Sequence, residues 1–167
     1  MREIEYRAFV KETKKMLPVT DLCFNETEAV GVSGCGNANC MLCVDWYSFD
    51  DVVLMQYIGR EDEDEKTIFE NDIVQVVLEH WPMGYYQEVE YVGVVKYDTD
   101  ICAYYLDLIK PPTVSGETIP DEIDGIKITR EDPEDFDTRF YFDASVDSAA
   151  MTVIGDIHEN PELLEAK

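Results

Sequence analysis

The chain has 167 residues, which suits one domain or one domain that carries a small subdomain. Hydrophobic residues make up 46% and aromatic residues 11%, so there is enough apolar material for a core and wholesale disorder is excluded. Lysine and arginine number 13 against 37 aspartates and glutamates, which gives a net charge of −24 that repels phosphates. Direct nucleic-acid binding is therefore not expected.

Charged residues are spread through the start of the chain and leave no apolar run of the length that a signal peptide needs. No stretch approaches the roughly 18 uninterrupted apolar residues that span a bilayer, and anionic lipid headgroups would repel this acidic surface. We therefore expect a cytoplasmic protein without membrane attachment. The five cysteines are then expected as thiols rather than as disulfides.

Two hairpins are predicted in the first third of the chain. Apolar and polar residues alternate over 3–10, which indicates a half-buried strand, and the apolar pattern resumes at 16–19 after the polar stretch 11–15. Glycine and asparagine, which supply the positive φ of tight turns, then separate the apolar segments 30–32 and 41–44. Each pair of apolar segments is expected to form an antiparallel hairpin.

The middle of the chain is rich in residues that favour strands. Segments 51–57 and 73–78 are β-branched and apolar, and the acidic run 61–65 between them predicts a solvated loop. Two further strand-like segments, 89–97 and 101–109, follow on either side of a short polar turn. They predict a third hairpin.

The last third of the chain is less regular. Prolines, glycines and acids at about 111–137 predict a long acidic insertion that holds one short strand at 126–129. Two more strands are predicted at 139–142 and 151–155. Asn160, followed by proline and glutamate, is typical of a helix start and predicts a short C-terminal helix.

Short strands with turn signals between them, and no sustained amphipathic helix, predict a mainly β fold. We expect barrel-like antiparallel sheets with the long acidic insertion and the short C-terminal helix added to them. Residues 1–57 are expected to form an N-terminal hairpin or sheet region, and residues 58–167 a β-barrel-like region. These two regions are either separate or parts of one composite domain.

Five segments, found in order from the first residue to nearly the last, carry a resemblance to a known family. They are MREIEYRAF at 1–9, KETKKM at 11–16, LMQYIG at 54–59, IFENDIV at 68–74 and VIGDIHENPELL at 153–164. In combination they resemble the YopX family of phage and prophage proteins. The resemblance implies a mostly β, barrel-containing protein carried by bacteriophages, and it implies no activity and no catalytic residue.

The chain departs from the family pattern at two turns. The family commonly has Asn-Gly in the turn after Gly59, where this chain has Asp64 and Glu65, and commonly has glycine where this chain has Asn71. Asparagine tolerates the left-handed conformation, so we expect the backbone to be kept there, whereas the loss of Asn-Gly changes the other turn. The stretch at about 35–43 and the acidic insertion lie outside the resemblance, so a function special to this member would reside in them.

Three cysteines form the one metal-like motif of the sequence. Cys35, Cys40 and Cys43 have the spacing C-x4-C-x2-C, which can place three thiolates around a tetrahedral Zn²⁺ and which also begins a plant-type iron–sulfur motif. No fourth ligand is adjacent, and residues elsewhere in the chain would have to complete the site: Cys23, Cys102, His80 or His158. We favour buried thiols in a glycine- and asparagine-rich hairpin and expect no cofactor; a zinc-containing protein is the alternative.

The acidic run resembles a calcium-binding loop in composition, because two of its aspartates fall at ligand-like positions one and three. The pattern then fails, since Lys66, Thr67 and Ile73 occupy positions five, six and twelve. We interpret the run as a solvated loop and as a secondary candidate for binding. Its members are Glu61, Asp62, Glu63, Asp64 and Glu65.

No catalytic motif is present. The two histidines, His80 and His158, stand in no recognisable nucleophile or metalloprotease pattern, and no glycine-rich loop precedes a helix to hold a phosphate. Carboxylate pairs discriminate nothing in a chain with 37 acids. We therefore expect a protein without enzymatic activity and name no catalytic residue.

These observations favour a phage- or prophage-encoded accessory protein that binds an unidentified partner protein or assembles with itself into a homo-oligomer. Tryptophan and tyrosine dominate binding hot spots, so five aromatic residues are candidate anchors, with core packing as the competing interpretation. They are Trp46, Tyr47, Trp81, Tyr85 and Tyr86. The alternative function is an acidic DNA mimic that blocks a host nucleic-acid-binding protein, with carboxylates in two rows along one face as its signature.

Overall fold

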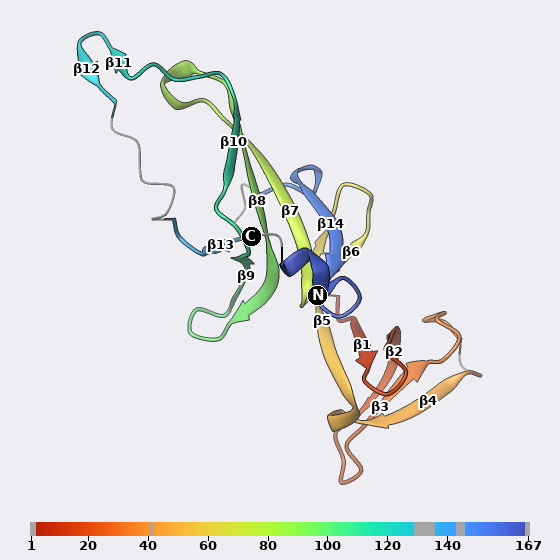
Figure 1. The fold of residues 1–167 in the computed structure, drawn as a ribbon. Helices are drawn as coiled ribbons and strands as arrows, with labels where there is room; N and C mark the ends of the chain where they lie inside the picture. Colours follow the sequence, from red (N-terminus) through yellow and green to blue (C-terminus); the bar gives the residue numbers. More distant parts are fainter. Residues whose placement is uncertain (1–2, 41, 129–135, 143–145, 166–167) are drawn as a thin grey trace.

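The computed structural model describes residues 3–40, 42–128, 136–142 and 146–165, and its strands form two large antiparallel sheets (Figure 1). The first sheet has the strand order β4-β3-β2-β1-β5-β6. Its strands are β1 (Tyr6–Val10), β2 (Lys15–Cys23), β3 (Ala29–Ser33), β4 (Val44–Ser48), β5 (Val52–Glu61) and β6 (Thr67–Phe69). The predicted mainly β fold is confirmed.

Both hairpins predicted at the start of the chain are present in the first sheet. Ala8 of β1 lies opposite Leu17 of β2, and Val30 of β3 lies opposite Tyr47 of β4. The alternating pattern of these strands turns one apolar face inward, as expected for a half-buried sheet. The buried side chains of this N-terminal cluster are Ala8, Val10, Val30, Val32 and Val52.

The second sheet has the order β13-β9-β8-β7-β14, and β10 pairs with the outer part of β8. Its strands are β7 (Asp72–His80), β8 (Gln87–Asp98), β9 (Ala103–Leu108), β10 (Thr113–Gly116), β13 (Arg139–Tyr141) and β14 (Met151–Asp156). The third predicted hairpin is confirmed as the antiparallel pair β8–β9. A small separate pair, β11 (Glu122–Ile123) with β12 (Ile126–Lys127), lies beyond β10. Part of the strand predicted at 126–129 lies outside the described residues.

The hairpin of β7 and β8 projects from the body of the molecule (Figure 1). Its ladder runs without a break from Ile73 opposite Val94 to His80 opposite Gln87. A 3₁₀ turn, η2 (Pro82–Gly84), closes the hairpin, and Met83 and Gly84 both have positive φ there. We call residues 77–90 together with β10 the arm.

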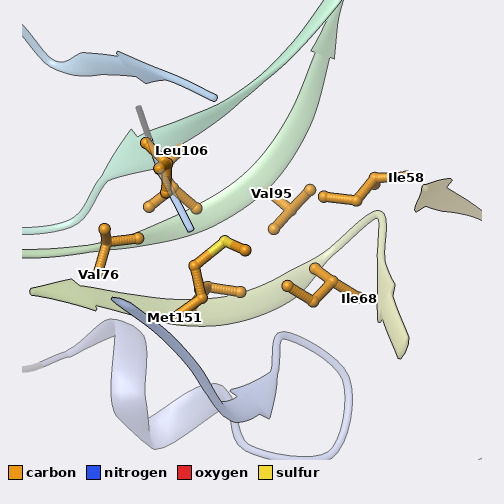
Figure 2. Close-up of a cluster of buried hydrophobic side chains, with 8 residues drawn as sticks. Ile58, Ile68, Val76, Val95, Leu106 and Met151 are labelled. Carbon is orange, nitrogen blue, oxygen red and sulfur yellow. The ribbon is translucent and has the colours of Figure 1, made fainter. Parts of the chain in front are cut away.

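One buried cluster joins the two sheets (Figure 2). β5 and β6 of the first sheet contribute Ile58 and Ile68, which pack against residues from β7, β8, β9 and β14 of the second. β5 makes this contact because it is long, pairing with β1 through residues 52–56 and with β6 beyond Tyr57. The cluster, called the shared core below, consists of Ile58, Ile68, Val74, Val76, Val95, Leu106, Val146 and Met151.

Polar contacts also tie the sheets together where β6 turns into β7. Arg7 of β1 donates a hydrogen bond from Nη2 to Asp72 Oδ1 at 2.6 Å, and its guanidinium lies over the Phe69 ring. Asp72 Oδ2 accepts from the backbone N–H of Phe69 at 2.7 Å. Asn71, which lies between Phe69 and Asp72, has φ +68°. It therefore keeps the left-handed backbone expected for the position where the family has glycine.

Two parts of the expected architecture are not seen. Among the described strands both large sheets are open, each with two unpaired edges, so the barrel-like closure predicted from strand spacing is wrong. Where a short C-terminal helix was predicted, the chain makes a single 3₁₀ turn, η4 (Pro161–Leu164). Asn160 does not cap this turn with its side chain; its Oδ1 accepts a hydrogen bond from the Asp156 N–H instead.

None of the helical segments in the described part of the chain is long and apolar enough to cross a membrane.

Candidate functional site

The end of the arm exposes aromatic and sulfur-containing side chains. Trp81 is 55% exposed, and its ring packs against the ring of Tyr86 with their centroids 5.4 Å apart. Met83, at the tip between them, is also exposed. Two of the five predicted anchors are therefore brought together, and Tyr85 follows directly after the tip in a half-buried position.

The Trp81–Tyr86 pair is held in place by acidic neighbours. The Tyr86 hydroxyl donates to Glu88 Oε1 at 2.7 Å, and this hydrogen bond raises the pKa of Tyr86 to about 12. The Tyr86 N–H donates to Glu117 Oε2 at 2.7 Å, which connects the arm's tip to the chain just after β10. Tyr86 thus stays neutral and fixed at physiological pH.

A hollow of about 640 Å³ lies near the same end of the arm, between the outer part of β8, β10 and the segment that follows β10, and its lining includes neither Trp81 nor Tyr86. Its apolar lining comes from Pro82, Val89, Val114, Ile119 and Ile128. Among the described residues that line it, Glu117 is the one carboxylate. The carboxylates on the arm and on the segment after β10 are Glu79, Glu88, Glu90, Glu117, Asp121, Glu122 and Asp124. The hollow, called the arm groove below, is thus mainly apolar and belongs to a part of the chain that is rich in carboxylates.

The other two predicted anchors lie on β4, in the other sheet. Trp46 is 52% exposed on this edge strand. Tyr47 is half-buried and packs against the N-terminal cluster, as the core-packing interpretation expects. The five aromatic residues predicted as anchors therefore lie in two places, three at the end of the arm and two on β4.

The acidic run between β5 and β6 is not uniformly solvated. Asp62 is only 4% exposed and accepts three backbone N–H bonds, from Asp64, Lys66 and Val153, at 2.9–3.0 Å. Burial alone would raise the pKa of Asp62, but these donors outweigh burial and lower it. The solvated-loop prediction is therefore wrong for this one residue, which fastens the loop to β14.

Replacing Asp62 by alanine is expected to lower the free energy of unfolding by about 1–3 kcal/mol, because it leaves three N–H groups without their acceptor. The pKa of this carboxyl is lower in the folded protein, so its contribution is present above pH about 4 and is lost as the pH falls further. Urea unfolding at pH 7 measures the effect. Asp64→Ala, which removes the same charge from an exposed position in the same loop, should cost much less. Equal losses would contradict the role of Asp62.

The three motif cysteines converge at the tip of the β3–β4 hairpin. The last ladder pair of this hairpin is Ser33 opposite Val44, so Cys35 and Cys43 leave the two strands close together. The chain between them turns back and brings Cys40 to the same place, and the three sulfur atoms all lie within 4.8 Å of one another. Cys35 and Cys43 are exposed and Cys40 is half-buried, so the expectation of buried thiols is wrong.

The three thiols, called the thiol cluster below, influence one another's protonation. Hydrogen bonds with the Ser33 side chain, the Asn37 backbone and Cys40 lower the pKa of Cys35 to about 7. Hydrogen bonding with Cys40 and Cys35 raises the pKa of Cys43 to about 11. The cluster therefore carries its first negative charge on Cys35 near neutral pH, and thiolates are the form of cysteine that binds metals and reacts with electrophiles.

The residues considered as a fourth ligand do not join the thiol cluster. Cys23 pairs with Ala29 at the opposite end of β3, and Cys102 lies in the turn between β8 and β9. His80 is at the end of β7, beside the arm groove. The His158 ring stacks on Phe9 of β1, with centroids 4.6 Å apart, and burial lowers its pKa.

Comparison with known proteins gives the chain a family. The family model described as YopX protein matches residues 5–165. The chain belongs to the YopX family. No curated protein matches this family member. Among solved structures it is similar to the crystal structure of protein EF1440 from Enterococcus faecalis, with 17% sequence identity over 98% of this chain and 99% of that chain and a TM-score of 0.48.

Sequence reasoning missed the part of the arm groove that comes from residues 114–128 of this YopX family member. Val114, Ile119 and Ile128 are spaced apolar residues in a polar, proline-containing segment. Isolated apolar residues in such a segment were the signal that could have indicated a buried or binding surface. The strand with which β10 pairs could not be predicted, because the pairing of β10 with β8 has no signature in local sequence.

Proposed function

We propose that this YopX family member is a non-enzymatic accessory protein, of phage or prophage origin, that binds a partner protein through the end of the arm. The observation that supports it is the exposed Trp81 ring, packed against Tyr86 at the end of a projecting hairpin that also carries an apolar hollow. Large aromatic side chains held rigidly at the surface are typical of protein-binding hot spots. The phage origin comes from the sequence resemblance.

The charge around the groove supports a particular kind of partner. Seven carboxylates lie on the arm and on the segment after β10, where Lys127 of β12 is the one described lysine; Lys110, just before β10, is paired with Glu90 at 2.7 Å. With a net charge of −24, two copies of this chain would repel each other when their arms meet. The partner proposed is therefore a protein segment with apolar side chains flanked by lysine or arginine.

The test uses two matched tryptophans. Tagged wild-type protein captures its partner from bacterial lysate, and the purified partner is then titrated against wild type, Trp81→Ala and Trp46→Ala. These tryptophans are similarly exposed, 55% and 52%, but lie on different sheets. We expect Trp81→Ala to weaken binding at least about tenfold and Trp46→Ala to leave it unchanged.

Two results would contradict this proposal in favour of its alternatives. A basic DNA-binding partner that competing DNA displaces, and whose affinity Trp81→Ala does not change, would support the acidic DNA mimic. Recovery of the bait alone, as an oligomer that Trp81→Ala dissociates, would support self-assembly.

A further inference from the structure

We propose that the thiol cluster of Cys35, Cys40 and Cys43 binds one zinc ion. This inference is independent of the arm groove, since the cluster lies at the end of the first sheet and the groove belongs to the second. It assigns a metal site to the stretch of the chain that lies outside the family resemblance.

The distances between the sulfur atoms are close to those of a zinc site. Zinc binds cysteine sulfur at about 2.3 Å in a tetrahedron, whose edges are then about 3.8 Å long. The three sulfurs of the thiol cluster lie within 4.8 Å of one another. Closing the remaining gap requires movements of about 1 Å or less, which side-chain rotation in an exposed loop supplies.

The loop backbone already has the conformation that gathers the sulfurs. The Gly34 N–H donates to the Cys43 carbonyl at 2.7 Å, which extends the hairpin past its last ladder pair. This hydrogen bond holds the backbone of Cys43 close to the backbone next to Cys35. The Cys40 N–H donates to the Asn37 carbonyl at 2.9 Å, and the turn so formed brings Cys40 back towards the other two cysteines. Gly36, with φ +80°, starts that turn in a conformation that other residues rarely adopt.

The buried Ser33 side chain forms hydrogen bonds with the loop. Its hydroxyl donates to the Asn37 carbonyl at 2.7 Å and lies 3.5 Å from Cys35 Sγ. Because a hydroxyl carries one proton, Ser33 orients a Cys35 thiolate, as neighbouring groups commonly orient metal ligands, when that proton turns from the Asn37 carbonyl to the sulfur. These hydrogen bonds order the segment from Ser33 to Cys40, which reduces the entropic cost of binding a metal.

The donor atoms select the kind of metal. Thiolates favour Zn²⁺ and other soft ions over Mg²⁺ and Ca²⁺, which prefer oxygen. Among the described residues no histidine, aspartate, glutamate or further cysteine places a ligand atom with the three sulfurs. Two of the three cysteines are exposed, so the fourth position faces solvent and takes water or a donor from another molecule.

The experiment measures zinc and cobalt binding by the full chain under reducing conditions. Zn²⁺ is titrated against a chromophoric chelator in the presence of excess Mg²⁺, and bound zinc is counted by elemental analysis. We expect one zinc per chain in wild type and at least about a hundredfold weaker binding in Cys40→Ser and in the triple Cys35→Ser/Cys40→Ser/Cys43→Ser variant. The matched controls, Cys23→Ser and Cys102→Ser, should bind zinc like wild type.

Cobalt gives a readout that does not depend on any variant folding correctly. Co²⁺ bound to wild type is expected to show sulfur-to-metal charge transfer and the strong visible bands of a tetrahedral site, and X-ray absorption of the zinc form should show three sulfurs and one lighter atom. Zinc bound equally well by the triple variant would assign binding to surface carboxylates and overturn the proposal. So would octahedral cobalt without sulfur bands, or no tight zinc binding by the reduced wild type.

Discussion

Replacing Asp72 by alanine is expected to lower the free energy of unfolding by about 3–5 kcal/mol. Asp72 is 1% exposed, and its carboxylate is the ion-pair partner of Arg7 and the acceptor for the Phe69 N–H. Without it, a largely buried guanidinium loses its counter-charge at the junction of the two sheets. The Met55 sulfur and the Phe69 ring, which Arg7 also contacts, are weak substitutes.

The matched control is Asp107→Ala, which breaks the half-exposed ion pair between Lys96 and Asp107 in the second sheet. Both substitutions remove one negative charge, so the general relief of charge repulsion is the same. Exposed pairs contribute little, and we expect a loss below about 1 kcal/mol. Urea unfolding followed by tryptophan fluorescence measures both, and similar losses would refute a special role for the buried pair.

The ion pair is expected to matter because breaking it is costly, not because it is a strong net stabiliser. Burial raises the pKa of Asp72 even with Arg7 beside it, so removal from water outweighs the attraction. The double variant Arg7→Met/Asp72→Asn removes both charges and keeps an acceptor for the Phe69 N–H. It should therefore recover most of the stability that Asp72→Ala loses.

Leu106→Ala is expected to lower the free energy of unfolding by about 2–5 kcal/mol, because it opens a cavity in the shared core. Leu106 is fully buried there, on β9, facing residues from both sheets (Figure 2). Leu42→Ala makes the same chemical change where the side chain is 95% exposed, and should alter stability by about 0.5 kcal/mol or less. Denaturant unfolding of both variants provides the measurement, and a Leu106→Ala loss as small as that of Leu42→Ala would mean that the sheets do not share a core.

The strands and hairpins could be predicted from sequence because they depend on local patterns. Alternation in residues 3–10 gave β1, and the glycine- and asparagine-rich stretch gave the β3–β4 turn. Barrel closure could not be predicted, because alternation reveals which face of a strand is buried and not which strands are neighbours. The same limit explains why the extension of β5 from Tyr57 to Glu61, which carries Ile58 into the shared core, was missed.

The candidate sites show a similar division. The spacing of Cys35, Cys40 and Cys43 correctly indicated that their sulfurs can meet, since all three lie in one short loop. Their exposure depended on the packing around the loop and was not predictable. In the acidic run, composition could not single out Asp62, because its partner Val153 lies 91 residues away.

The two clusters of buried side chains differ in when their parts are made. The N-terminal cluster is complete once residue 52 has been synthesised, whereas the shared core also needs Met151. On the ribosome, the first hairpins can therefore close around their own core early in translation. The end of β5 and the strands β6 to β9 keep part of their shared-core face uncovered until β14 has left the exit tunnel and can pair with β7.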